Sequence, residues 1–169
     1  HMDEPISKPT AIAMMKIAQE AKKSVAVVLG GDGGYELFGG YDRYRWSLLS
    51  SYYQKIPAFL RHLSNHSQRL KKLNVTPSID RYALFMFQKN DILSQVVNPH
   101  FLDNSTYAFF QKKYFSRRFP EKFEDLMMEV DRKSWLVDDS LVLTDKMTMS
   151  SGLECRVPLL DKEIVEFAC

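Results

Sequence analysis

The sequence predicts a mostly α-helical chain with a single buried strand, an incomplete piece of an α/β domain. The strand is predicted at Val25–Leu29, an apolar run typical of a strand buried on both faces. A cluster of glycines around one aspartate follows directly, from Gly30 to Gly34. Because a lone strand leaves its ladder N–H and C=O groups unpaired, we expect its neighbouring strands to lie outside this chain.

Helical periodicity and capping residues predict the other elements in order. The first helix is expected at Ser7–Lys22, where Pro9 suits an early helical position and Ile12 and Ile17 contribute to an apolar face. The later predictions are Trp46–Leu60 with a break at Pro57, helix or loop at His62–Leu73, helices at Ser78–Val97, Ser105–Arg117 and Glu121–Leu136, a helix capped by Asp138 or Asp139 that runs to about Ser151 before Gly152, and a last helix capped by Asp161.

Composition limits the class of protein. The chain has 169 residues, of which 45% are hydrophobic, as in a globular domain and unlike a disordered one. A net charge of +2 gives no strong field that would attract nucleic acid. No apolar run approaches the ~20 residues that span a bilayer. Two cysteines, Cys155 and Cys169, favour a reducing compartment, and a cytoplasmic location is expected.

The glycine cluster after the strand has two interpretations. Without a Cβ, backbone N–H groups can approach an anion closely, so the cluster is suited to hold phosphate. The two common nucleotide fingerprints do not fit, because no Gly-Lys followed by Ser or Thr occurs and Glu36 stands at the third glycine of the dinucleotide pattern. A tight strand-to-helix turn without a ligand remains the alternative.

Three blocks in the same order resemble the synthetase domain of the glutamine-hydrolysing asparagine synthetase family. The main block, GGDGGYELFGGY, begins at Gly30, and the second contains DKMTM from Asp145 and LECRVPLLD from Leu153. The third, upstream, contains DEP from Asp3 and PTAI from Pro9, whereas residues 47–123 carry no matching motif. The resemblance implies an incomplete Rossmann-like α/β domain of the PP-loop (adenine nucleotide α-hydrolase) class.

The resemblance also implies a domain organisation. Residues 1–2 are typical of an expression scar, and residues 3–169 match part of the synthetase domain. They do not include the family's glutaminase domain, its upstream pyrophosphate loop or its C-terminal part with a downstream lysine. We therefore expect this chain alone to be inactive as a synthetase and to hold no cofactor tightly.

The implied parent activity is an ATP-dependent amide transfer of the asparagine biosynthesis type. ATP with Mg²⁺ would activate an aspartate-like carboxylate, which ammonia derived from glutamine then attacks. Two residues depart from the family pattern, since Gly30 replaces a serine and Tyr35 replaces the aspartate that helps hold Mg²⁺. A phenol is a poor ligand for a hard cation at neutral pH. A catalytically degenerate homologue that acts as a binding or scaffold module is therefore the alternative.

The resemblance assigns a role to each matched residue. Asp32 is the candidate catalytic residue, expected to handle a proton in the second half-reaction. The phosphate-binding candidates are Gly30, Gly31, Gly33 and Gly34. The substrate-pocket candidates are Thr10, Glu36, Asp145, Lys146, Glu154 and Arg156. Glu154 and Arg156 share a face only in an extended segment, where they would form either a pocket wall or a buried ion pair before Pro158.

The remaining features indicate partners only weakly. His62, His66 and His100 lie far from any cysteine pattern, so no zinc site is expected. The basic residues Arg61, Arg69, Lys71, Lys72, Lys112, Lys113, Arg117 and Arg118 are interpreted as solvated helix faces, and RNA binding is the weaker alternative. The expected partners are small-molecule substrates. Self-association through Val25–Leu29 is also expected, because an apolar strand can pair edge to edge with a second copy.

Overall fold

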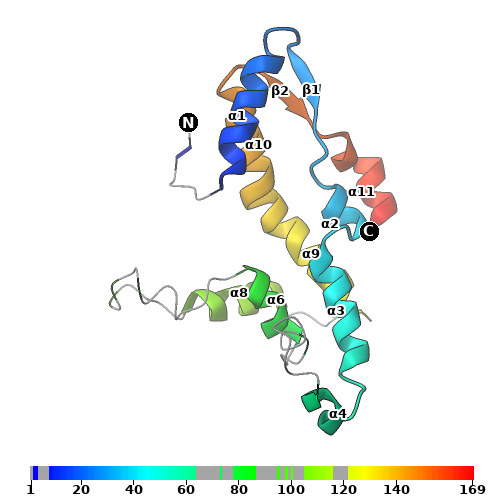
Figure 1. Ribbon diagram of the computed structural model, residues 1–169. Helices are drawn as coiled ribbons and strands as arrows, with labels where there is room; N and C mark the ends of the chain where they lie inside the picture. Colours follow the sequence, from blue (N-terminus) through cyan, green and yellow to red (C-terminus); the bar gives the residue numbers. More distant parts are fainter. Residues whose placement is uncertain are drawn as a thin grey trace. The chain divides into compact units, whose positions relative to one another are not determined.

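The computed structural model describes residues 2–3, 8–63, 73, 78–86, 95, 98, 100, 105–115 and 122–169 (Figure 1). They divide into two units, one made of His1–Gly40 with Met128–Cys169 and the other of Tyr41–Met127. Every candidate site residue lies in the first unit. Among the described residues, no helix combines the length and apolar character needed to cross a bilayer.

The first unit brings together both ends of the chain. Its elements are α1 (Thr10–Ala21), β1 (Val27–Leu29), α2 (Gly34–Phe38), the π-helix η2 (Leu136–Leu141), α10 (Val142–Met149), β2 (Glu154–Arg156), the 3-10 helix η3 (Pro158–Leu160) and α11 (Lys162–Ala168). α9 (Phe123–Lys133) has residues in both units. The sequence therefore predicted most of these helices, but not the short α2.

The prediction of a single buried strand is wrong. β1 pairs in parallel with β2, with Val27 opposite Glu154 and Leu29 opposite Arg156 (Figure 1). β1 is also not buried in the described part of the chain, because Val27 and Leu29 are 39% and 74% exposed. β2 was missed because three residues are too few to show the alternation that identifies a strand.

α1 packs along α10 and forms one hydrophobic core cluster of the first unit, where the two helices lie side by side (Figure 1). Ala11, Met14 and Met15 contact Leu143 and Met147. The buried stripe of α1 therefore contains small alanines, whereas Ile12 and Ile17, expected on the apolar face, are exposed. Small side chains line the interface between α1 and α10 because they let the backbones of the two helices approach closely.

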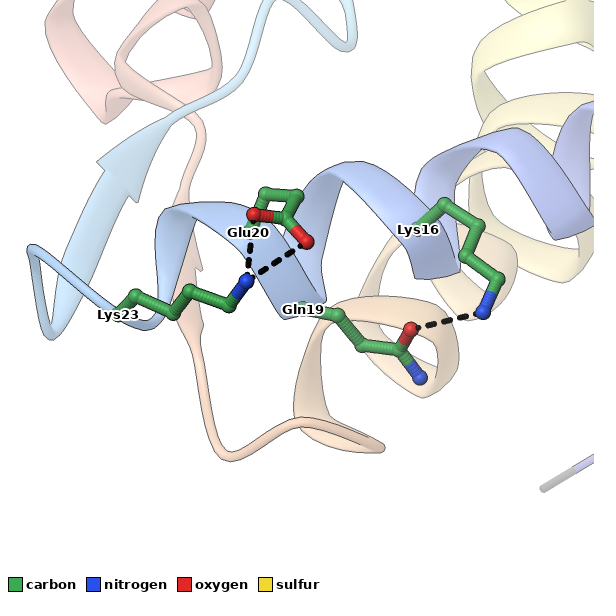
Figure 2. Close-up of polar contacts among 4 residues, drawn as sticks. All are labelled: Lys16, Gln19, Glu20 and Lys23. Carbon is green, nitrogen blue, oxygen red and sulfur yellow. Dashed lines mark hydrogen bonds and ion pairs between the residues drawn. The ribbon is translucent and has the colours of Figure 1, made fainter.

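The exposed side of α1 carries polar contacts next to the exposed Ile12 and Ile17. Lys16 donates to Gln19, and Lys23, just beyond the helix, forms an ion pair with Glu20 (Figure 2). These contacts join residues three apart, which are neighbours on a helical surface. Both members of the ion pair are largely exposed. Such solvated pairs contribute little stability.

The capping predictions were correct at the C-terminal end of the unit. Gly152 has φ +66° and follows the last turn of α10, and the N–H of Leu153 reaches back to the carbonyl of Thr148. Asp161 caps α11 by accepting a hydrogen bond from the Glu163 N–H at 3.0 Å. α10 therefore ends, and α11 begins, where the sequence predicts.

The prediction of a helix cap at Asp138 or Asp139 is wrong. Helical backbone continues through Trp135 into η2, so no free helix start exists there for a side chain to cap. Asp139 instead forms an ion pair with Lys8, whose ammonium also lies over the Trp135 ring. This contact ties the segment before α1 to the π-helix.

The second unit is helical, with an aromatic centre. Its elements are α3 (Asp42–Tyr53), α4 (Ala58–Leu63), α6 (Ser78–Met86) and α8 (Ser105–Phe115), so the break at Pro57 is confirmed. Tyr82 is 1% exposed and contacts the rings of Phe110 and Phe115. The predictions for residues 64–72, 87–94, 96–97 and 116–121 lie outside the described residues.

The unpaired edge of β1 leads to a first prediction. Ala26 and Gly30 bond to β2 through their backbone groups, and because strand residues alternate, the backbone groups of Val27 and Leu29 point to the other edge. In the described residues β2 is the only strand paired with β1. We expect two copies of the chain to associate through this edge and Val27→Lys to shift the protein toward monomer, as measured by size exclusion with light scattering.

The control for this prediction is Ile17→Lys, which adds the same charge at an exposed site on α1. It is expected to leave the association unchanged, and circular dichroism checks that both variants keep the helix content of the wild type. A monomeric wild type at micromolar concentration would contradict strand-driven association, as would an oligomer that Val27→Lys does not change.

Candidate functional site

The loop after β1 is packed closely against β2 at Gly30. The N–H of Gly30 donates to the carbonyl of Arg156 at 2.8 Å. A Cβ at this position would lie 2.9 Å from Cys155 Sγ and 3.3 Å from Asp32 Oδ2. A serine, the residue usual in the family here, would therefore displace the thiol or the carboxylate. Gly30 and Cys155 fit each other in this chain.

Two further loop glycines lie against η3. Gly33 has φ +89°, and a Cβ there would lie 2.1 Å from Leu160 Cδ2. A Cβ on Gly34 would lie 2.9 Å from Leu159 Cδ1. Gly31 differs, because a Cβ there would meet no atom within 4 Å and the residue is exposed. Packing against the described residues thus explains three of the four phosphate-binding candidates, and Gly31 is the one that such packing does not explain.

Asp32 is held on both carboxylate oxygens. Ser140 Oγ donates to Oδ1 at 2.7 Å, and Thr144 Oγ1 donates to Oδ2 at 3.1 Å. Asp32 is half-buried, Ser140 is half-buried and Thr144 is buried. The structure therefore joins the glycine loop to the η2–α10 segment through one carboxylate. Neither Ser140 nor Thr144 was predicted as a site residue, since they lie 108 and 112 residues from Asp32.

Cys155 lies beside this carboxylate but lacks the character of a nucleophile. Burial, and after it the charge of Asp32, raises the pKa of the Cys155 thiol above its ordinary value. The thiol therefore stays protonated at neutral pH, where the thiolate would be the reactive form. Cys155 acts here as a small apolar side chain packed beneath Gly30.

Tyr35 and Glu36 begin α2 but lie in different surroundings. Tyr35 is 60% exposed, and a Cβ built on Gly40 would lie 2.3 Å from Tyr35 Cδ1, so the ring covers that glycine. Glu36 is buried, and its carbonyl accepts a hydrogen bond from Arg132 Nη1 at 3.2 Å. The hydrogen bond from Arg132 is a second contact that the sequence did not indicate. It joins α9 to a backbone carbonyl, and a backbone acceptor leaves no pattern of side chains in the sequence.

The other pocket candidates do not gather around Asp32. Thr10 and Asp145 are exposed, and Lys146 forms an ion pair with Asp3 at 2.8 Å. The hydrogen bond from Lys146, together with its charge, lowers the pKa of Asp3 below its ordinary value. Within the part of the chain that the structure describes, no hydrogen bond or ion pair joins Thr10, Asp145 or Lys146 to Asp32.

Glu154 and Arg156 form the expected pair in an extended segment. Arg156 Nε donates to Glu154 Oε1 at 2.7 Å on β2. Both side chains are exposed, so the alternative of a buried ion pair is wrong. Solvent screens an exposed pair, and the contribution of Arg156 to the loop comes instead from its carbonyl, which accepts from Gly30.

The side chain at position 35 does not fit a resident Mg²⁺ ion. Mg²⁺ selects carboxylate and phosphate oxygens, whereas Tyr35 offers a phenol oxygen where the resemblance implies an aspartate. Among the described residues, no group of three or more His, Cys, Asp or Glu side chains is arranged to hold a metal ion. We therefore assign no step of the chemistry to a metal held at Tyr35.

Comparison with known proteins decides the family. The family model described as asparagine synthase matches residues 1–169. This chain belongs to the asparagine synthase family. No solved structure matches the chain significantly.

The relatives are longer proteins. The chain is 34% identical to asparagine synthetase (glutamine-hydrolyzing) 1 of Bacillus subtilis over 99% of its own residues and 28% of that protein. It is 32% identical to a putative asparagine synthetase (glutamine-hydrolyzing) of Mycobacterium tuberculosis, again over 99% of this chain but 27% of the relative. The chain thus spans little more than a quarter of the length of these relatives.

Proposed function

We propose that residues 3–169 are part of the synthetase domain of an ATP-dependent amidotransferase of the glutamine-hydrolysing asparagine synthetase type. The match of the family model across residues 1–169 carries this proposal. The named relatives support it, because both are described as glutamine-hydrolysing asparagine synthetases. In the complete protein this part belongs to a PP-loop α/β domain, and β1 and β2 supply two parallel strands of its sheet.

The first half-reaction activates the acceptor. A carboxylate oxygen of an aspartate-like substrate attacks the α-phosphorus of ATP, the bond from that phosphorus to the β-phosphate bridge breaks, and pyrophosphate leaves. Gly31 is the loop position with open space in front of its Cα, so the polyphosphate approaches the backbone there. Glu36, Asp145, Lys146, Glu154, Arg156 and Thr10 remain candidates for recognising the two substrates in the complete protein.

The second half-reaction forms the amide. The lone pair of ammonia, released from glutamine, attacks the acyl carbon, the bond from that carbon to the phosphate oxygen breaks, and AMP leaves. The attacking nitrogen must lose a proton, and Asp32 accepts it on a free lone pair before passing it to water. A carboxylate suits this task because its oxygen can accept a proton without any movement of the backbone.

The experiment uses the complete natural protein that contains this chain. Pyrophosphate release and asparagine formation are measured with ATP, aspartate and either glutamine or ammonium. Asp32→Asn is expected to slow amide formation by on the order of 10²-fold or more, because general base catalysis contributes 10²–10⁴-fold. Labelled pyrophosphate is expected to exchange into ATP at close to the wild-type rate, because that exchange reports the first half-reaction alone.

Asp138→Asn is the matched control, since it removes an exposed carboxylate from η2 that does not contact the loop. It is expected to keep wild-type activity. A complete protein that releases no pyrophosphate with aspartate or related carboxylates would overturn the proposal, and binding of ATP without turnover would then favour a degenerate binding module.

A further inference from the structure

The most specific polar contact in the first unit is the pair of hydroxyls on Asp32. One hydroxyl binds each oxygen of the carboxylate, Ser140 at 2.7 Å and Thr144 at 3.1 Å. The donors come from one continuous helical segment and the acceptor from the glycine loop. Because more than a hundred residues of chain separate them, this contact is a product of the tertiary fold.

Neighbouring hydroxyls in the same segment behave differently. Ser134 donates to the carbonyl of Val130 at 2.7 Å, and Thr148 donates to the carbonyl of Thr144 at 2.9 Å. Such bonds to the preceding helical turn are the ordinary choice of serine and threonine within helices. Ser140 and Thr144 instead donate to Asp32, although a carbonyl of the preceding turn lies within reach of any helical hydroxyl. The tertiary fold therefore selects these two side chains for the carboxylate.

The backbone of the segment supports this arrangement. Ser140 lies in the π-helix η2 and Thr144 in the α-helix α10 that follows directly. Residues four apart lie on one helical face, so both hydroxyls can approach a single carboxylate. A π-helical turn holds an extra residue and rotates the face that it presents, and such turns are frequent at functional sites. The π-helical turn thus contains Ser140, one of the two residues that donate hydrogen bonds to Asp32.

We propose that Ser140 and Thr144 are positioning residues for Asp32, which they hold in one orientation for proton transfer during amide formation. This inference rests on the proposed function. A carboxylate has about four lone-pair sites, and the two hydroxyls occupy one on each oxygen. The remaining lone pairs stay available to accept the proton from the attacking nitrogen, while the hydroxyl protons remain on Ser140 and Thr144. A fixed carboxylate meets that proton in a productive geometry more often than a rotating one.

The test replaces each hydroxyl in the complete natural protein. Ser140→Ala and Thr144→Val are each expected to lower kcat for amide formation by roughly tenfold, because a misplacement of about 1 Å can cost up to about 10²-fold in rate. The KM for ATP and the exchange of labelled pyrophosphate into ATP are expected to stay within about twofold of wild type, since neither depends on the proton transfer. Thr144→Ser restores the hydroxyl and is expected to restore most of kcat.

The controls remove hydroxyls whose hydrogen bonds, among the described residues, stay within their own helix. Ser134→Ala matches Ser140→Ala, and Thr148→Val matches Thr144→Val with equal side-chain volume and similar burial. Both controls are expected to keep kcat. In an Asp32→Asn background, Ser140→Ala is expected to cause no further loss, because its effect acts through Asp32. Thermal unfolding of every variant checks that the fold is kept.

The outcomes separate the two proposals. A wild-type protein without carboxylate-dependent pyrophosphate release overturns both. An active wild type whose Ser140→Ala and Thr144→Val variants keep kcat overturns only the positioning role. That role also fails if Ser134→Ala and Thr148→Val reduce kcat as much as their matched variants do, or if Thr144→Ser is as slow as Thr144→Val.

Discussion

Replacing Gly33 with alanine is expected to lower the free energy of unfolding of this chain by about 3 kcal/mol. Two physical costs add at this position. The backbone has φ +89°, a conformation that alanine adopts only with strain. The new methyl group would also lie 2.1 Å from Leu160 Cδ2, far inside van der Waals contact. Chemical denaturation followed by circular dichroism measures the loss.

Gly31→Ala is the matched control for Gly33→Ala. Gly31 has no positive φ and no atom within 4 Å of an added Cβ, so alanine there is expected to leave stability unchanged or to raise it by about 0.4–1 kcal/mol. Leu160→Ala in the Gly33→Ala background is expected to recover the steric part of the loss but not the backbone strain. Equal stability of the Gly31→Ala and Gly33→Ala variants would contradict the geometry of the loop.

Replacing Tyr35 with aspartate is expected to strengthen binding of ATP in the presence of Mg²⁺ by at least roughly tenfold in the complete natural protein, because it adds a carboxylate ligand for the ion. The substitution is expected to cost little stability, since the Tyr35 side chain is 60% exposed and its ring mainly covers Gly40. An acidic residue in the first turn of α2 is also electrostatically acceptable. Titration of ATP at several Mg²⁺ concentrations measures the effect.

Tyr35→Asn serves as the comparison, because it has the shape of aspartate without the charge. It is expected to leave the magnesium dependence as in the wild type. If Tyr35→Asp and Tyr35→Asn bind ATP equally well at every Mg²⁺ concentration, position 35 is not a metal position in this protein. In that case Tyr35 does not argue against synthetase activity in the complete protein.

Local signals in the sequence predicted the elements with strong boundaries. The break at Pro57, the stop at Gly152 and the cap at Asp161 each depend on a residue and its immediate neighbours, and all three are present. The glycine block likewise pointed to the loop that follows β1. A single sequence can therefore predict those element boundaries that neighbouring residues determine.

Features that depend on distant partners could not be predicted in the same way. β2 became a strand because β1 lies beside it, and three residues carry no periodic pattern of their own. Ser140 and Thr144 look like ordinary helical hydroxyls until Asp32 is placed next to them. The exposure of Val27 was also misjudged, because an apolar composition does not reveal which neighbours are present.

The pairing of Val27 with Glu154 closes a loop that contains the whole of residues 41–127. The entropy of closing such a loop grows only with the logarithm of its length, so doubling the intervening segment would cost about 0.6 kcal/mol. Insertions and deletions between β1 and β2 therefore change the free energy of the strand pair, and of the Asp32 contact beside it, only slightly. The segment between them can diverge in length among homologues while the hydrogen bonds from Ser140 and Thr144 to Asp32 are retained.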